Sequence, residues 1–225
     1  MRKIITLAIA GLLCQAGFAQ KAGIDSLRAQ MDSSLRAAIH ADSIKIKKEY
    51  ADMERWEKIK TIAQYPAINA GGFSGVVPVS DITEAPDPNL MYKIVFEVTY
   101  ANPDSTAAKA NDAFVEVARN INLHVASGIP ANKIIPVIVV HAGALNAICN
   151  NAHYRERYHT DNPNLKLIAD FEKAGARFIA CGQAMTFLDI KKEDLLPEVK
   201  VALSAQPILT SYQLKGYVLR RVDVN

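Results

Sequence analysis

Residues 133–141, K-I-I-P-V-I-V-V-H, form an almost wholly apolar run that is rich in β-branched side chains and ends at a histidine. Such a continuous run predicts a strand buried on both faces, which is typical of a parallel sheet covered by helices. Similar runs predict further strands at residues 92–99, 177–181, 200–205 and 217–222.

The segments between these strands have the spacing and the end signals of helices. Helical patterns cover residues 107–126, 144–158 and 164–174, with a short polar helix after Cys181 and another from Pro207. Asn162 is expected to cap the third of these helices, with Pro163 at its first position. Strands that alternate with helices predict right-handed βαβ units, and so an α/β helix–sheet–helix sandwich of about five parallel strands.

A different composition precedes this α/β domain, which we place at residues 92–225. Residues 20–62 predict a helical arm with an apolar stripe that includes Ile46, Tyr50 and Trp56, and with a break near residues 41–43. The stripe packs either on the arm's own domain or on a neighbouring subunit. Residues 63–91 contain four prolines and three glycines, which favours a linker with a short edge strand near residues 75–79.

The first 19 residues have the pattern of a secretory signal peptide. Arg2 and Lys3 precede a short apolar run, and small residues follow at 17 and 19. Leu13 before Cys14 argues against a lipid anchor, and no other stretch has the length and apolarity of a transmembrane helix. We therefore expect a soluble, exported protein, periplasmic in a Gram-negative source.

Charge and cysteine content narrow the class of partner. Without Arg2 and Lys3, the 26 basic and 23 acidic side chains become 24 and 23, a formal charge of +1. Such a balance implies neither a nucleic acid nor an acidic membrane as partner. The two cysteines that remain, Cys149 and Cys181, are too few for a disulfide scaffold, although they are candidates for one pair.

Cys181 is the main candidate for chemistry. It ends an apolar strand and Gly182 and Gln183 follow at once, so the thiol is expected at the carboxyl edge of the sheet, where α/β proteins bind ligands. A helix amino terminus beside it would favour the thiolate, while the alternative is a small buried apolar side chain. His141, Gly143 and Asn164 are expected at the same edge.

Other chemistries find little support. The first strand is followed by Tyr100 and Ala101 rather than by a glycine-rich phosphate loop, and no G-x-S-x-G turn is present. His141, Cys149 and His153 would make a zinc site with an open position, but their spacing matches no strong motif. We therefore expect no cofactor and no metal.

With these residues in view, residues 92–222 resemble the DsrE/DsrF-like family, in its exported branch. The matching elements are V-I-V-V-H-A-G at residues 137–143, N-P-N at 162–164, A-G at 174–175, C-G-Q at 181–183 and Q-x-x-G-Y at 213–217. The resemblance implies a flavodoxin-like three-layer sheet of order 2-1-3-4-5, no flavin, and a homo-oligomer, commonly a trimer or hexamer. In the sulfur-relay members, a cysteine at the end of the third strand carries a persulfide, and Cys181 has that position here.

The function expected first is thus a persulfide carrier or sulfurtransferase that acts through Cys181 and exchanges sulfur with a partner protein or a small sulfur compound. Gly182 would allow close approach and His141 would orient a substrate. Two alternatives stay open: an oligomeric module that binds a small ligand without catalysis, and a redox protein that uses Cys149 and Cys181 as a pair.

Overall fold

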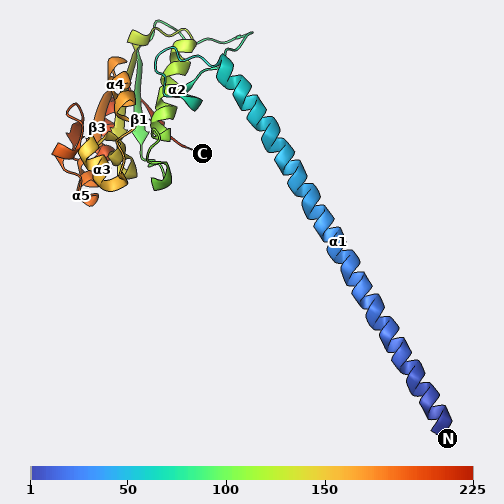
Figure 1. Ribbon diagram of the computed structural model, residues 1–225. Coiled ribbons are helices and arrows are strands. Elements are labelled where there is room, and N and C mark those ends of the chain that lie inside the picture. The colour runs from blue at the N-terminus through green and yellow to red at the C-terminus, as the bar shows by residue number, and fades with distance from the viewer. Residues whose placement is uncertain (1, 225) are drawn as a thin grey trace. The chain divides into compact units, whose positions relative to one another are not determined.

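The computed structural model describes residues 2–224, and for residues 2–25 it describes the backbone alone (Figure 1). The chain divides into two compact units at residues 58 and 59. Helix α1 (Arg2–Ile62) makes up the first unit and continues to Ile62. It has no break at residues 41–43, where one was expected, because neither Gly nor Pro interrupts its hydrogen-bond ladder there.

The apolar stripe of α1 is exposed within the described residues. Its large side chains from Leu27 to Met53 are all more than half exposed. None of the helices in the described part of the chain has both the length and the apolarity needed to cross a membrane. The signal peptide at residues 1–19 stays a prediction, since Met1 and the side chains of the others lie outside the description.

The second unit is the predicted α/β sandwich with a five-stranded parallel sheet. Its strands are β1 (Tyr92–Val98), β2 (Ile134–Val140), β3 (Arg177–Cys181), β4 (Lys200–Ala202) and β5 (Val218–Arg221). Its helices are α2 (Asp112–Ala126), α3 (Asn151–Tyr158), α4 (Leu165–Lys173), α5 (Gly182–Phe187) and α6 (Ala205–Leu214). The fold class predicted from the sequence is therefore confirmed.

The order of the strands is β4-β3-β2-β1-β5, which corrects the expected order 2-1-3-4-5. The expected order would have put β2 at an edge, yet β2 is the most completely buried strand. The edges are instead β4 and β5, which are short and carry exposed side chains such as Lys200 and Arg221. Charged, short strands suit an edge because its backbone groups are open to water and to other chains.

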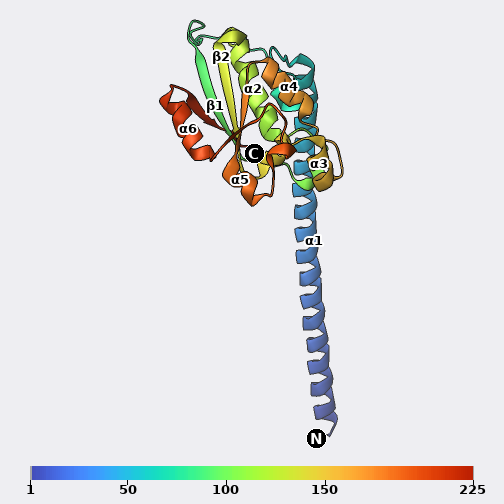
Figure 2. The same ribbon diagram turned by 90° about the vertical axis from the view of Figure 1, so that its left-hand side faces the viewer.

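The two faces of the sheet bury different cores. α2 and α4 cover one face, where Phe114, Phe171 and Phe178 pack edge to face. α6 covers the other face with Ala205 and Leu209 (Figure 2). Right-handed crossovers explain this division, because the chain passes from β1 to β4 in one direction across the sheet and returns through α6 to β5 in the other. A reversal of direction moves the connecting helix to the opposite face of the sheet.

Several predicted element boundaries move. The helix expected at residues 107–126 begins at Asp112, because the Asn111 side chain accepts hydrogen bonds from the Ala113 and Phe114 amides. Residues 144–158 divide into a 3₁₀ segment, Ala142–Ile148, and α3. Of the edge strand expected at residues 75–79, the structure has a single antiparallel bridge between Gln64 and Val76.

Candidate functional site

Cys181 lies where the sequence predicts, as the last residue of β3 and the residue preceding α5. Its side chain is on the α6 face and shares a core cluster with Ala205, in the first turn of α6. Cys181 is 5% exposed, so the thiol is nearly covered by the protein. The amino termini of both α5 and α6 lie at this edge, and helix amino termini favour a negative charge.

Gly182 and Gln183 connect this site to the neighbouring edge strand. A Cβ atom at Gly182 would lie 2.8 Å from the Ala202 carbonyl oxygen, and the Gln183 amide donates to the Leu203 carbonyl at 3.1 Å. The close approach that glycine allows here is therefore one between two parts of the protein. Both residues position Cys181 through the backbone, and the Gln183 side chain is exposed.

His141 follows β2 and pairs with a residue that the sequence reasoning missed. Its Nε2 lies 3.1 Å from Oε1 of Glu97, on β1, and Oε2 of Glu97 accepts a hydrogen bond from Nε of Arg221, on β5, at 3.1 Å. The Glu97 and His141 side chains are 11% and 20% exposed. The sequence signal that could have identified Glu97 is its place as an acidic residue next to the carboxyl end of a mostly buried strand.

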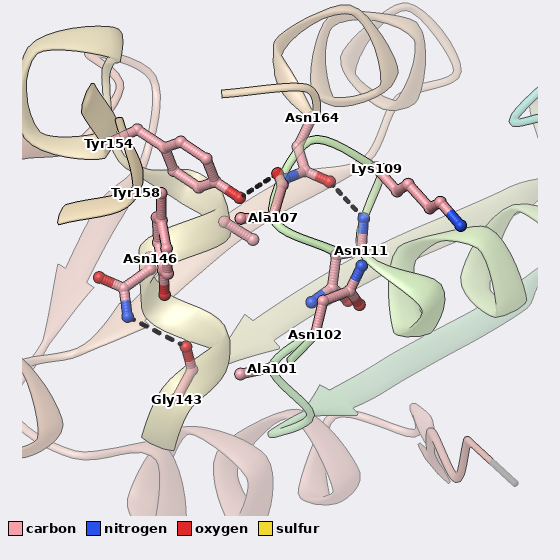
Figure 3. Close-up of a pocket in the computed structure, with 11 residues that line it drawn as sticks. Ala101, Asn102, Ala107, Lys109, Asn111, Gly143, Asn146, Tyr154, Tyr158 and Asn164 are labelled. Carbon is pink, nitrogen blue, oxygen red and sulfur yellow. Dashed lines mark hydrogen bonds between the residues drawn. The ribbon is translucent and has the colours of Figure 1, made fainter. Parts of the chain in front are cut away.

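Gly143 and Asn164 belong to a separate small pocket (Figure 3). It encloses about 290 Å³ between its lining atoms, part of it open to solvent, and lies between the loop after β1, the 3₁₀ segment after β2, and α3. Its lining is Ala101, Asn102, Ala107, Lys109, Asn111, Gly143, Asn146, Ala147, Tyr154, Tyr158 and Asn164. The structure thus divides the predicted site residues, and Cys181 does not line this pocket.

The polar side chains around this pocket mostly bind backbone groups of the surrounding loops. Asn164 accepts from the Asn111 amide at 2.7 Å, Tyr154 donates to the Ala107 carbonyl, and Asn146 donates to the Gly143 carbonyl (Figure 3). Asn162 accepts from the Asn164 amide and donates to the carbonyls of Ala147 and Cys149. The predicted cap at Asn162 is therefore wrong: α4 begins at Leu165 with Asn164 at its N-cap position, and Asn162 instead holds the turn before it and the loop after β2.

Cys149 is separated from Cys181 by the sheet. Cys149 belongs to the core of the α2 face, is fully buried, and donates from Sγ to the Leu145 carbonyl. Both cysteines are free thiols. Burial, with a smaller effect of Asp194, raises the pKa of Cys149 to about 12. The two thiols thus belong to different core clusters and form no disulfide in the described structure, which gives the Cys149–Cys181 redox pair no support.

The candidate zinc ligands His141 and His153 are likewise directed to different partners. His141 is directed to Glu97, while Nε2 of His153 lies 3.4 Å from the Asn146 side-chain oxygen and its Nδ1 lies 3.7 Å from Asp194. In the part of the chain that the structure describes, no three His, Cys, Asp or Glu side chains are grouped so that they could hold a metal ion.

Comparison with known proteins adds a family match. A family model described as the DsrE/DsrF-like family matches residues 93–220, more than half of the chain. Among solved structures, a protein of unknown function from Methanobacterium thermoautotrophicum is similar, with 17% sequence identity and a TM-score of 0.44. The match covers 58% of this chain and 98% of that one. A search of curated proteins gave no match.

Proposed function

Because the chain belongs to the DsrE/DsrF-like family, we propose that it carries sulfur as a persulfide on Cys181. The observation that carries the proposal is the position of this thiol, at the carboxyl end of β3 and beside the amino termini of two helices. Parallel sheets bind their ligands at this edge, and a thiolate is the form of cysteine that reacts.

The transfer needs no reagent beyond the sulfur donor. The Cys181 thiolate attacks the outer sulfur of a donor persulfide, a new S–S bond forms, and the electron pair of the donor's S–S bond leaves with the donor thiolate. An acceptor thiolate then attacks the terminal sulfur on Cys181 and restores the thiol.

The raised pKa of Cys149 favours Cys181 as the carrier of the two. The experiment is intact-mass spectrometry after incubation with a small-molecule persulfide. The wild type and the matched control Cys149→Ser should each gain one sulfur atom, and Cys181→Ser should gain none. A wild type without the gain, or an equal gain in Cys181→Ser, would refute the proposal.

The assembly and location belong to the same proposal. Apolar side chains of α5, of β4 and of the residue after β4 are exposed close to Cys181 in sequence or in the sheet: Phe187 is 86% exposed, Val201 44% and Leu203 78%. Exposed apolar side chains at a site edge support a homo-oligomer with Cys181 near a subunit boundary. Light scattering on the mature chain should show a trimer or hexamer. A monomer at micromolar concentration would exclude the proposed homo-oligomer.

The pattern of the first 19 residues supports export to the periplasm. Cell fractionation with amino-terminal sequencing of the product should find a mature protein that begins near Gln20. An uncleaved protein in the cytoplasm would contradict this part of the proposal.

A further inference from the structure

Four side chains lie near the carboxyl edge of the sheet, on the face that α6 covers. Glu97 and Arg221 pair with each other level with Val139, and His141 and Cys181 lie two residues further along their strands. Glu97, His141, Cys181 and Arg221 each lie two residues after an apolar side chain that packs on this face. Since side chains alternate between faces along a strand, all four share the α6 face. The strand order places them in the sequence Arg221, Glu97, His141, Cys181.

The register places His141 beside Cys181. Val139 pairs with Ile179 and Val140 with Ala180, so the next two residues are His141 and Cys181. His141 keeps extended backbone angles, φ −149° and ψ −179°, and its amide still donates to the β1 carbonyl of Val98. Neighbouring strands lie about 4.8 Å apart, so the imidazole and the thiol occupy adjacent positions on one face.

The contact between His141 and Glu97 determines which nitrogen of the imidazole carries the proton. Glu97 is bound at Nε2, which assigns the Nε2 proton to this hydrogen bond and leaves Nδ1 of the neutral ring as an acceptor. Among the described residues, the structure shows no hydrogen bond to Nδ1. The imidazole therefore has its acceptor nitrogen available for a proton from the neighbouring thiol.

Glu97 has two partners, and Arg221 is the more exposed of them. Its pair with Arg221 is a cross-strand ion pair at the edge of the sheet, and the Arg221 side chain is 75% exposed, so that pair contributes little to stability. The carboxylate is nevertheless almost covered, and a covered charge needs its partners. Its second oxygen is directed to His141, toward the thiol and away from solvent-exposed Arg221.

Few other charges face this row. α5 has no ionisable side chain, and the single one on α6 is Tyr212, which packs on Tyr217 before β5 begins. Lys200 on β4 is exposed and level with Ile179, and Asp223 is exposed beyond β5. Among these groups, His141 is the one that the register places next to Cys181.

We propose that His141 is the proton acceptor for Cys181, with Glu97 as its positioning residue and Arg221 holding Glu97. This inference rests on the proposed sulfur-carrying role of Cys181. The proton moves from Sγ to Nδ1, which gives a thiolate and an imidazolium. The Glu97 carboxylate stays ionised and stabilises the imidazolium through Nε2. The thiolate then attacks the outer sulfur of the donor.

The test measures the reactivity of the thiol apart from sulfur transfer. Alkylation of Cys181 by iodoacetamide is followed against pH in a Cys149→Ser background, for the parent, Glu97→Gln, His141→Asn and the matched control Glu116→Gln. Glu116 is an acid on α2 that pairs with Arg119, remote from Cys181 in the sequence. Circular dichroism establishes that each variant is folded.

His141→Asn and Glu97→Gln should displace the alkylation profile to higher pH and slow the reaction at pH 7 by about tenfold or more, since a neighbouring opposite charge commonly changes an ionisation equilibrium by that factor. Glu116→Gln should leave the profile unchanged. Profiles of His141→Asn and Glu97→Gln that coincide with the parent would overturn the inference. If the profiles move but the parent gains no sulfur, the proposed function fails and the proton acceptor stands.

Discussion

The buried thiol of Cys149 gives a prediction whose size follows from the structure. Burial raises its pKa from the ordinary value of 9.0 to about 12, a difference of three. At pH 8 the folded protein therefore has about a thousandfold less Cys149 thiolate than the unfolded chain, since each pKa unit is a factor of ten. Because only the thiolate is alkylated at an appreciable rate, Cys149 should react about a thousandfold more slowly in the folded protein.

The assay uses Cys181→Ser, in which Cys149 is the remaining cysteine of the mature chain. Iodoacetamide labelling is followed by peptide mass spectrometry in buffer and in concentrated urea, and the ratio of the two rates is the measured quantity. Cys149→Ser checks that no other peptide is labelled. A native rate within about tenfold of the urea rate would refute the reasoning, because it would require an open and ionisable thiol.

Three further predictions concern stability. Because the pKa of Cys149 is raised in the folded state, the neutral thiol contributes fully to the free energy of unfolding below pH 9, and this contribution is lost as the pH rises toward 12. Urea titrations across this range should show the free energy of unfolding fall by up to about 4 kcal/mol. The fall should be smaller in Cys149→Ala. Asn122 is fully buried and bonds the Ala67 and Ile68 amides and the Ile68 and Ser74 carbonyls, so Asn122→Ala should cost about 3 kcal/mol or more. The control is Asn120→Ala, because the Asn120 side-chain oxygen is buried and has no hydrogen-bond partner among the described residues. This variant should cost much less, and equal costs would contradict the assignment. Gly182→Ala should cost about 1–3 kcal/mol in thermal or urea unfolding, because its Cβ meets the Ala202 carbonyl oxygen at 2.8 Å, and a neutral effect would show that β4 moves freely.

The parts of the fold that the sequence predicts are those set by local pattern. Apolar runs such as that of β2 identify the strands, and the helical spacing between them identifies a parallel sheet. The place of Cys181 at the carboxyl edge follows in the same way, since it needs only the end of one strand and the start of one helix.

The boundaries that moved did so through side chains from elsewhere in the loop. Asn111 delays the start of α2 because its side chain caps the amides of that helix. Asn164, a candidate ligand residue by sequence, holds the Asn111 amide across 53 residues. A single sequence does not distinguish an amide that binds a ligand from one that binds a distant loop, because both are polar and follow a turn.

The amino-acid sequence by itself determined that this chain has a parallel α/β domain with one cysteine at the carboxyl edge of its sheet. Only the tertiary structure decided that Cys149 lies on the opposite face, and that Glu97, His141 and Arg221 share a face with Cys181. The physical reason is that local patterns fix the type of an element, whereas neighbours across a sheet depend on strand order and register. Those are set by burying the most apolar strands at the centre and leaving the short, charged β4 and β5 at the edges.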